Sequence, residues 1–210
     1  MEKHPIDLSL LAETFDINNR GDCQHLEKWL TSSYVFNDFE QTLFNQVYEK
    51  TRNDVNYFNE EELKIQLIAF LFFLADIDIE GKIKVFYERP LTAILQEKHK
   101  ISVVVDCMVA TPMRFNKPKL PYFFLQEFKK GKGDDKDPEA QMLAAMLVAQ
   151  HKNDDGRPVY GSFLIGSNWW FTTLIGQEYC LSREFNASNR TDLQQIVFIL
   201  RRLKEIILEN

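Results

Sequence analysis

The chain has 210 residues, of which 45% are hydrophobic and 13% aromatic, so it can form a substantial core within one domain. Its formal net charge of -6 at pH 7 argues against a protein that coats nucleic acid by bulk electrostatics, and any nucleic-acid contact must be local. The longest uncharged apolar run, residues 65–75, is shorter than the roughly 20 residues that span a bilayer, and no signal-peptide pattern is visible, so we expect a cytoplasmic protein without a membrane partner.

Residues 1–55 are predicted to be mainly helical. Apolar side chains recur at helical spacing in residues 22–33 and 37–54, and Asn37 is placed to cap the second of these helices. We expect these helices to form a packing layer. The predicted organisation is therefore an N-terminal helical extension, 1–55, followed by a domain at 56–210.

A stronger helix is predicted at residues 59–76. Asn59 can cap it, and three glutamates occupy its first turn beside the positive end of the helix dipole. The rest of this helix is apolar on nearly all sides, which predicts burial between layers. Three segments rich in Val, Ile, Phe and Tyr follow and predict an antiparallel meander. They are residues 83–95, 101–110 and 120–130.

The next helix is predicted to begin with Asp137 as N-cap and Pro138 at the first helical position. A strand at 158–166 follows, and then a hairpin that turns at Gly176. The final helix, residues 191–210, carries one apolar stripe, and Thr191 and Gln194 have the spacing of a capping box.

This order of elements predicts an α/β fold with three layers, α/β/α, and a mixed central sheet. A strand, a crossover helix and a parallel strand lie within residues 122–165, next to strands that pair antiparallel. Helices are therefore expected on both faces of the sheet, with the hairpin and the last helix added after the core.

Charged residues stand where two of the predicted strands end. Residues two apart in a strand share a face, so Glu127 and Lys129 continue the face that carries Phe123 and Leu125. On the preceding strand Asp106 follows a run of three valines. Two carboxylates about 4 Å apart repel by roughly 4 kcal/mol at an effective dielectric near 20. A cation is expected beside them, and oxygen ligands of this kind suit Mg2+.

The bare pattern of an acid two residues before a lysine is not specific, because it also begins at Glu62, Glu80 and Asp134. What distinguishes Glu127 is that it ends an apolar strand next to a strand that carries its own acid. A divalent ion held there could lower the pKa of a bound water, while Lys129 orients that water or stabilises developing negative charge.

Cysteines and histidines give no metal-site pattern. Cys23, Cys107 and Cys180 are widely spaced without a CxxC motif, and we expect them to be reduced and buried. The four histidines show neither HxxxH nor HExxH spacing.

Residues 59–166 resemble the PD-(D/E)XK nuclease superfamily, whose restriction-endonuclease-like core has the order αβββαβ. The resemblance rests on VVVD ending at Asp106, on LQEFK with Glu127 and Lys129, and on Gln141 in the helix that follows. The later segment YGSFLIGSNWWFTTL is similar to the strand after this helix in nuclease domains of type I restriction enzyme subunits. The chain departs from the pattern before Asp106, where a valine replaces the proline that is often present.

The resemblance implies roles for the residues on the two strands. Asp106 and Glu127 would be ligands of Mg2+ or Mn2+, with the Phe128 carbonyl as a third ligand, and Lys129 would be the catalytic lysine. Gln141 would be an accessory group near the substrate.

The resemblance also implies an acid from the preceding helix as a metal ligand. We favour Glu60, because Lys64 follows it by one turn and the apolar positions then match, while Glu61 or Glu62 stays open as an alternative.

The expected function is a Mg2+-dependent nuclease that hydrolyses phosphodiester bonds, with DNA favoured over RNA and restriction, defence or DNA repair as the setting. One alternative is a catalytically inactive nuclease-fold domain that binds nucleic acid or a partner protein. Another is a structural protein, in which Asp106 and Glu127 would not converge. A homodimer would help a small nuclease to cut both strands, so a homodimer or a protein partner stays open as an alternative.

Two further groups could meet nucleic acid, although a structural interpretation is favoured for each. Trp169 or Trp170 could stack on a base, but a strand tryptophan usually packs in the core. Basic residues near the predicted strand ends could contact phosphates, but a solvated connector is favoured. These residues are Arg114, Lys117, Lys119, Lys130 and Lys132.

Overall fold

A computed structural model of the chain describes residues 4–19, 23–130 and 137–209. Over these residues the chain forms an eight-stranded mixed sheet in the order β1-β7-β6-β5-β4-β3-β2, with β8 paired to β6. The strands are β1 Asn18–Asn19, β2 Lys84–Leu95, β3 His99–Met113, β4 Lys117–Lys129, β5 Val159–Ile165, β6 Asn168–Ile175, β7 Glu178–Leu181 and β8 Phe185–Asn186.

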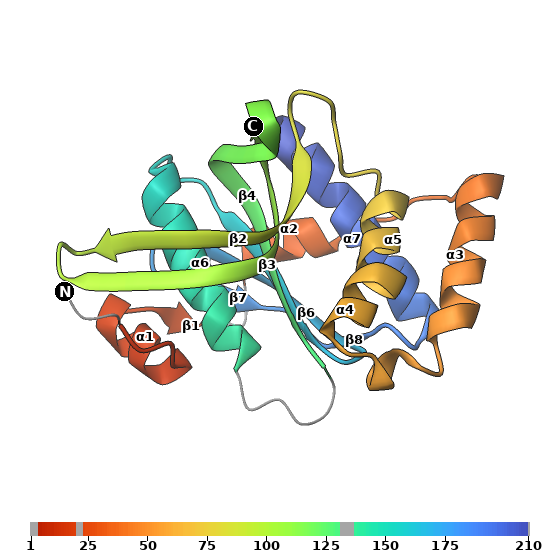
Figure 1. Cartoon of the computed structure of the whole chain (residues 1–210), viewed down its shortest axis with the longest axis horizontal. Coiled ribbons are helices and arrows are strands. Elements are labelled where there is room, and N and C mark those ends of the chain that lie inside the picture. Colours follow the sequence, from red (N-terminus) through yellow and green to blue (C-terminus); the bar gives the residue numbers. More distant parts are fainter. Residues whose placement is uncertain (1–3, 20–22, 131–136, 210) are drawn as a thin grey trace.

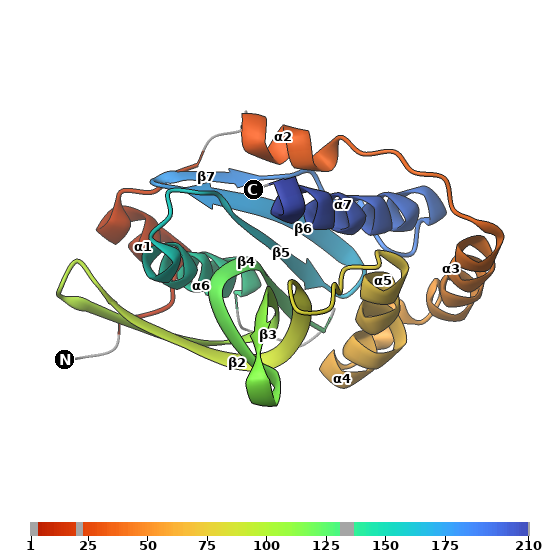
Figure 2. The same cartoon turned by 90° about the horizontal axis from the view of Figure 1, so that it is seen from above.

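Helices cover both faces of this sheet (Figures 1 and 2). They are α1 Leu8–Phe15, α2 Gln24–Leu30, α3 Asp38–Thr51, α4 Glu60–Leu63, α5 Ala69–Leu74, α6 Pro138–Asn153 and α7 Arg190–Glu209. A π-helical segment, Lys64–Ile68, joins α4 to α5, and short 3-10 turns lie at Val55–Tyr57 and Arg114–Asn116. The predicted three-layer α/β/α fold with a mixed sheet is confirmed.

Two hydrophobic clusters explain the three layers. One cluster joins α2, α3, α5 and α7 to one face of the sheet, and it includes Phe124 and Phe128 of β4. The other joins α1 and α6 to the opposite face, and it includes Leu125. Because side chains alternate along a strand, β4 supplies both clusters and lies at the centre of the sheet.

The predicted meander and crossover are both present. β2 pairs antiparallel with β3, and β3 with β4, whereas β4 and β5 are parallel and connected through α6. Asp137 caps α6 as predicted, since its side chain accepts a hydrogen bond from the Ala140 amide. The predicted caps Asn37 and Asn59 are also confirmed, each within a complete capping box.

The connector predicted between the second and third strands is wrong. Residues 111–119 continue both strands as a hairpin, with Thr111 paired to Lys119 and Met113 paired to Lys117. Only the turn Arg114–Asn116 separates the two strands. Prolines and charges favour a loop when the sequence is read locally, but the cross-strand partner holds these residues in the ladder.

The helix predicted at 59–76 is buried on one side only. Leu63, Leu67 and Leu71 are fully buried, whereas Ile65 and Phe73 are exposed. The expectation of burial on nearly all sides was therefore wrong, because α5 packs against α3 and α7 and leaves its remaining side open to solvent.

The capping box predicted at Thr191 is also wrong. The last helix begins at Arg190, and the Asn189 side chain accepts hydrogen bonds from the amides of Thr191 and Asp192. Thr191 therefore lies within the first turn. Asparagine is among the strongest N-cap residues, and it stands here two residues earlier than the expected cap.

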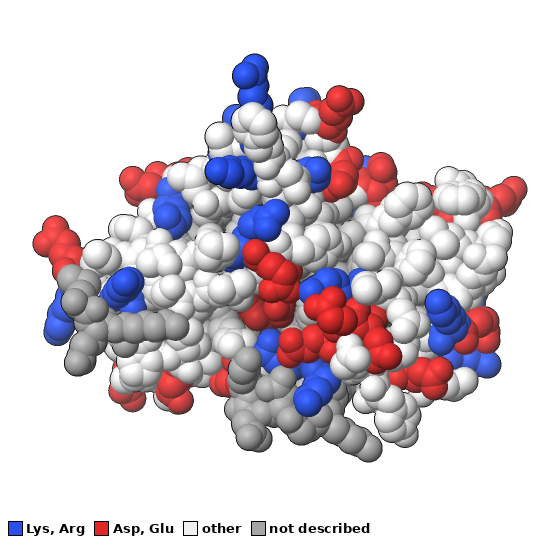
Figure 3. Space-filling model, in the orientation of Figure 1, with Lys and Arg blue, Asp and Glu red and all other residues white. Residues whose placement is uncertain are grey.

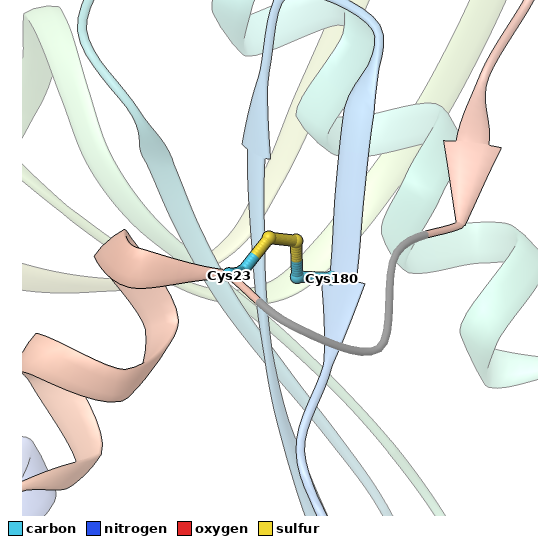
Figure 4. The surroundings of a disulfide bond; sticks show 2 residues. All are labelled: Cys23 and Cys180. Atoms are coloured by element: carbon cyan, nitrogen blue, oxygen red, sulfur yellow. A yellow bond between two sulfur atoms is a disulfide. The ribbon is translucent and has the colours of Figure 1, made fainter.

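A disulfide joins Cys23, just before α2, to Cys180 in β7 (Figure 4). The expectation that these cysteines are reduced was therefore wrong. They are 157 residues apart in sequence, and only the packing of α2 against the sheet brings their Cα atoms to 6.2 Å. Cys107 is free and buried as expected, and burial raises the pKa of its thiol well above the usual value, which keeps the thiol neutral.

The first 55 residues contribute to both clusters. Trp29 of α2 is fully buried, and its indole nitrogen donates a hydrogen bond to the Ile199 carbonyl in α7. On the other face, Leu11 and Phe15 of α1 belong to the cluster around α6. The proposed division between 1–55 and 56–210 stays a prediction. Among the residues described, no helix has the length and apolar character needed to cross a membrane.

Candidate functional site

A cavity of about 360 Å³ lies where β2, β3 and β4 meet the start of α4 and of α6. Its lining includes four acids, Glu60, Glu88, Asp106 and Glu127. Lys129 and Gln141 also line it. Figure 3 shows acidic side chains gathered near the centre of this face of the molecule. We call the four acids Glu60, Glu88, Asp106 and Glu127 the acidic cluster.

The register of the sheet brings Asp106 and Glu127 together. Cys107 and Gln126 are the last paired residues of β3 and β4 at this end, so the next position places Asp106 beside Glu127. Beyond that point the Phe128 amide donates its hydrogen bond, of 2.9 Å, to Oδ2 of the Asp106 carboxylate rather than to a backbone carbonyl of β3. This bond fixes the carboxylate against β4.

The first turn of α4 determines which of its glutamates reaches the acidic cluster. Glu62 turns back to the Asn59 amide in the capping box, and Glu61 forms an ion pair of 2.8 Å with Lys64. The Glu60 carboxylate lies 3.6 Å from the ammonium of Lys129. Of the three alternatives, Glu60 is therefore the one that the structure places with the strand residues.

Lys129 lies at the centre of the acidic cluster and is 5% exposed. Its Nζ is 3.6 Å from Glu60, 3.7 Å from Asp106 and 4.0 Å from Glu127, and it donates a hydrogen bond of 3.1 Å to the Phe128 carbonyl. One ammonium cannot neutralise three carboxylates, so this part of the site keeps a negative potential.

The Glu127 carboxyl is 2% exposed, and its Oε1 has no hydrogen-bond partner among the described residues. Burial raises its pKa well above the usual value of 4.5. The negative charge of Asp106 and a hydrogen bond between the two carboxyls act in the same direction, while the Lys129 ammonium opposes them. Without a further cation, Glu127 therefore holds its proton more tightly than an ordinary glutamate.

The oxygen atoms around Lys129 are of the chemical kind that a hard divalent cation binds. Oxygens of Glu60, Asp106, Glu127 and Phe128 lie within 4.0 Å of one point, the Lys129 nitrogen, and one carboxylate oxygen of Glu127 is buried without a partner. Carboxylate and carbonyl oxygens are the ligands that Mg2+ takes. Within the described ranges, however, no three His, Cys, Asp or Glu side chains are arranged to hold a metal ion. The acids converge on the ammonium instead.

Gln141 lies in the first turns of α6 and lines the same cavity. Its side-chain Oε1 is buried and has no hydrogen-bond partner among the described residues. An amide held in this way can accept a hydrogen bond from a water or a substrate group in the cavity. All five residues singled out from the sequence thus lie around one cavity.

Glu88 of β2 also lines the cavity, and the sequence did not point to it. Its neighbours Tyr87 and Arg89 pair with Cys107 and Val105, so Glu88 stands opposite Asp106, but it leaves the ladder with a φ of 52°. Its carboxylate forms an ion pair of 2.9 Å with Lys64. A proline two residues later, Pro90, was the available signal, since a proline inside a strand often marks an irregularity.

The other candidates from the sequence lie elsewhere. Trp169 is fully buried and belongs to the core as expected, and Trp170 stacks on the Phe163 ring. Lys130 is exposed at the end of β4. Lys132 lies outside the described residues. The remaining basic residues, Arg114, Lys117 and Lys119, are exposed at the far end of the β3–β4 hairpin.

No known family model matches the chain, and no curated protein matches it.

Proposed function

We propose that the protein is a metal-dependent nuclease of the PD-(D/E)XK type, which hydrolyses phosphodiester bonds of nucleic acid and prefers DNA. The observation that carries the proposal is the convergence of Asp106, Glu127 and Lys129 at neighbouring strand ends with Glu60 of α4 beside them. Restriction, defence or DNA repair is the setting that this function favours.

In the proposed reaction Asp106, Glu127 and Glu60 are the residues that would hold Mg2+ or Mn2+, and the Phe128 carbonyl would be a further oxygen ligand. The ion, when bound, supplies a Lewis acid that polarises the phosphate and makes water more acidic. Its charge also lets Glu127 lose the proton that burial favours. The role of these residues would be to bind the ion within the cavity that they line.

Lys129 supplies the second positive charge. Its ammonium would donate to a phosphate oxygen and stabilise the negative charge that develops there. Gln141 orients the attacking water through its unpartnered amide oxygen. The water oxygen forms the new bond to phosphorus, the bond to the leaving oxygen breaks, and that oxygen takes a proton from solvent while the proton of the attacking water passes to solvent.

Metal-dependent cleavage tests this proposal. Purified protein is incubated with plasmid, linear duplex DNA, single-stranded DNA and RNA, in Mg2+, in Mn2+ and in EDTA. Asp106→Asn and Lys129→Met each reduce cleavage by at least about a hundredfold. Glu61→Gln, which alters an exposed acid of the same helix turn, keeps wild-type activity. Cleavage that persists in EDTA or in both site variants contradicts the proposal.

A catalytically inactive nucleic-acid-binding domain is the second candidate. One observation favours it, namely that Lys129 already occupies the point on which the carboxylates converge. Calorimetric titration with Mg2+ and Mn2+ separates the two functions. Binding of nucleic acid without any heat of metal binding supports the inactive domain, whereas metal binding that is lost in Glu127→Gln supports the nuclease.

A further inference from the structure

The β3–β4 hairpin extends beyond its neighbours as a two-stranded arm, residues 111–121. Pairing of β2 with β3 ends at Ala110, and pairing of β4 with β5 begins only at Phe124. The tip, Arg114–Asn116, is the bright green turn that projects from the rest of the molecule in Figure 2. No other strand supports the arm in the described part of the chain.

The tip of the arm carries an aromatic ring that contributes nothing to the core. Phe115 is 93% exposed, and its backbone has a φ of 60°, in the left-handed region. A bulky residue in this conformation costs free energy, and a fully solvated ring gains none from burial. The next residue, Asn116, is left-handed too, with a φ of 55°. The turn thus presents the ring outward at a cost to folding.

Positive charge surrounds this ring. Residues 111–121 contain Arg114, Lys117 and Lys119 and no acid, in a chain whose net charge is -6. Arg89 of β2 lies beside the arm. None of these four basic side chains forms an ion pair with a carboxylate of the described ranges, in contrast to the arginines of α7. The charges of Arg114, Lys117 and Lys119 are therefore available to a polyanion, and Arg89, whose guanidinium lies over the Phe86 ring, adds a further positive charge beside the arm.

A cavity of about 500 Å³ lies between the arm and β2. Arg89, Phe115, Lys117 and Tyr122 are among the residues that line it. Cavities of about 300–1,000 Å³ are the size that small organic ligands occupy in proteins. One nucleotide unit of a chain fits such a space, with cations and aromatic rings on its walls.

We propose that the arm binds single-stranded nucleic acid, with an unpaired base stacked on Phe115 and the neighbouring phosphates held by Arg89, Arg114, Lys117 and Lys119. Aromatic rings stack on any exposed base, and lysine and arginine follow the backbone, which is the usual combination for single strands. A duplex hides its base faces and cannot use the ring in this way. The inference rests on the proposed function, since it names the form of nucleic acid that the same protein takes.

The arm and the acidic cluster are two ends of one strand. Lys119 and Glu127 are both in β4, eight residues apart, which is about 26 Å at the rise of a strand. Figure 3 shows basic side chains in the upper part of the face that carries the acidic cluster. A single strand of several nucleotides, bound along this face, would cover that distance. The arm would thus anchor a nucleic-acid strand, and the continuation of that strand would reach the cavity that the acidic cluster lines.

Binding measured without cleavage tests the arm separately from the proposed reaction. Fluorescence anisotropy of labelled single-stranded DNA is recorded with wild-type protein in EDTA. Phe115→Ala weakens binding about tenfold, and Phe115→Trp binds at least as tightly as wild type. Phe115→Leu keeps an apolar side chain but loses the ring, so it weakens binding as alanine does. Equal affinity of the Leu and Trp variants overturns base stacking.

The charge contribution needs a matched control at a distance from the arm. The arm variant combines Arg114→Gln, Lys117→Gln and Lys119→Gln, and the control combines Lys50→Gln, Lys98→Gln and Lys100→Gln, all exposed. The arm variant lowers the slope of log affinity against log salt by about 2, at about 0.7 per phosphate contact. The control leaves this slope unchanged. Equal loss in both variants means bulk electrostatics and overturns the inference.

Three further outcomes keep the two proposals apart. Tight arm-dependent binding without metal-dependent cleavage supports the arm and rejects the nuclease. Cleavage and affinity that arm variants leave unchanged reject the arm and keep the nuclease. Polyglutamate, an acidic polypeptide, is the last competitor. If it displaces the oligonucleotide and binds Phe115→Ala as tightly as wild type, charge alone explains the binding and the inference is overturned.

Discussion

Replacing Glu127 with glutamine should make the stability of the protein depend differently on pH. The carboxyl is almost fully buried, lies beside Asp106 and is only partly compensated by Lys129 at 4.0 Å. Its pKa in the folded protein is therefore raised well above 4.5, mainly by burial. Glutamine has nearly the same shape and no charge, so the variant removes the ionisation and keeps the packing.

The sign and the magnitude follow from linkage. Above pH 4.5 the unfolded chain releases this proton while the folded protein keeps it, so unfolding releases a proton and stability falls as pH rises. The decline is about 1.4 kcal/mol per pH unit until the folded pKa is reached. The glutamine variant lacks this decline. Its free energy of unfolding should therefore exceed that of the wild type by an amount that grows with pH from about 4.5 upward.

Urea denaturation in EDTA, at a series of pH values from 4 to 8, measures this difference. A precision of about 0.5 kcal/mol in the free energy of unfolding is enough to resolve a slope of about 1.4 kcal/mol per pH unit. Glu61→Gln is the control, because its side chain is 70% exposed in the same region. A difference between Glu127→Gln and wild type that stays constant with pH, or falls as pH rises, would refute the reasoning. A constant offset alone would reflect only the altered hydrogen bonding of the amide.

Lys129→Met in EDTA at pH 7 should lower the free energy of unfolding by about 3 kcal/mol, because the neighbouring acids lose their cation. Addition of Mg2+ should raise the melting temperature of this variant more than that of wild type. Equal shifts of the two melting temperatures would contradict a cation role for this position. Gly161→Ala should cost about 1–3 kcal/mol, because the added Cβ would lie 2.8 Å from the Met142 sulfur; urea denaturation checks this, and a neutral result would mean that the methionine moves freely. Reducing the bond between Cys23 and Cys180, which are 157 residues apart, should cost about 2–5 kcal/mol, measured with and without reductant, and Cys180→Ser should then be insensitive to reductant.

The helix starts that were predicted correctly depend on contacts within a few residues. Asn37 and Asn59 each cap a helix whose third residue is a glutamate that completes the box, so both partners are visible in the sequence. Thr191 had the same spacing to Gln194, but Asn189 accepts the hydrogen bonds of the first turn instead. Local signals fail when two residues compete for the same amides.

The acidic cluster could be predicted in part. Alternation along β4 placed Glu127 and Lys129 on one face, and the strand order brought Asp106 next to them. The choice of Glu60 depended on which partner each glutamate takes, since Glu62 completes the Asn59 capping box and Glu61 pairs with Lys64. Glu88 enters the cavity because β2 leaves its ladder at that position, and no periodic pattern records such an irregularity.

The sequence by itself determined the order of helices and strands from residue 59 onward, the starts of α3, α4 and α6, and the alternation that divides β4 between two cores, because these depend on interactions between close neighbours in the chain. The tertiary structure alone decided the extended β3–β4 arm, the disulfide across 157 residues and the position of Lys129 among three carboxylates. Each of these depends on register and packing between distant segments. A strand ladder or a buried charge is stabilised by partners that lie far away in sequence, so local pattern cannot specify it.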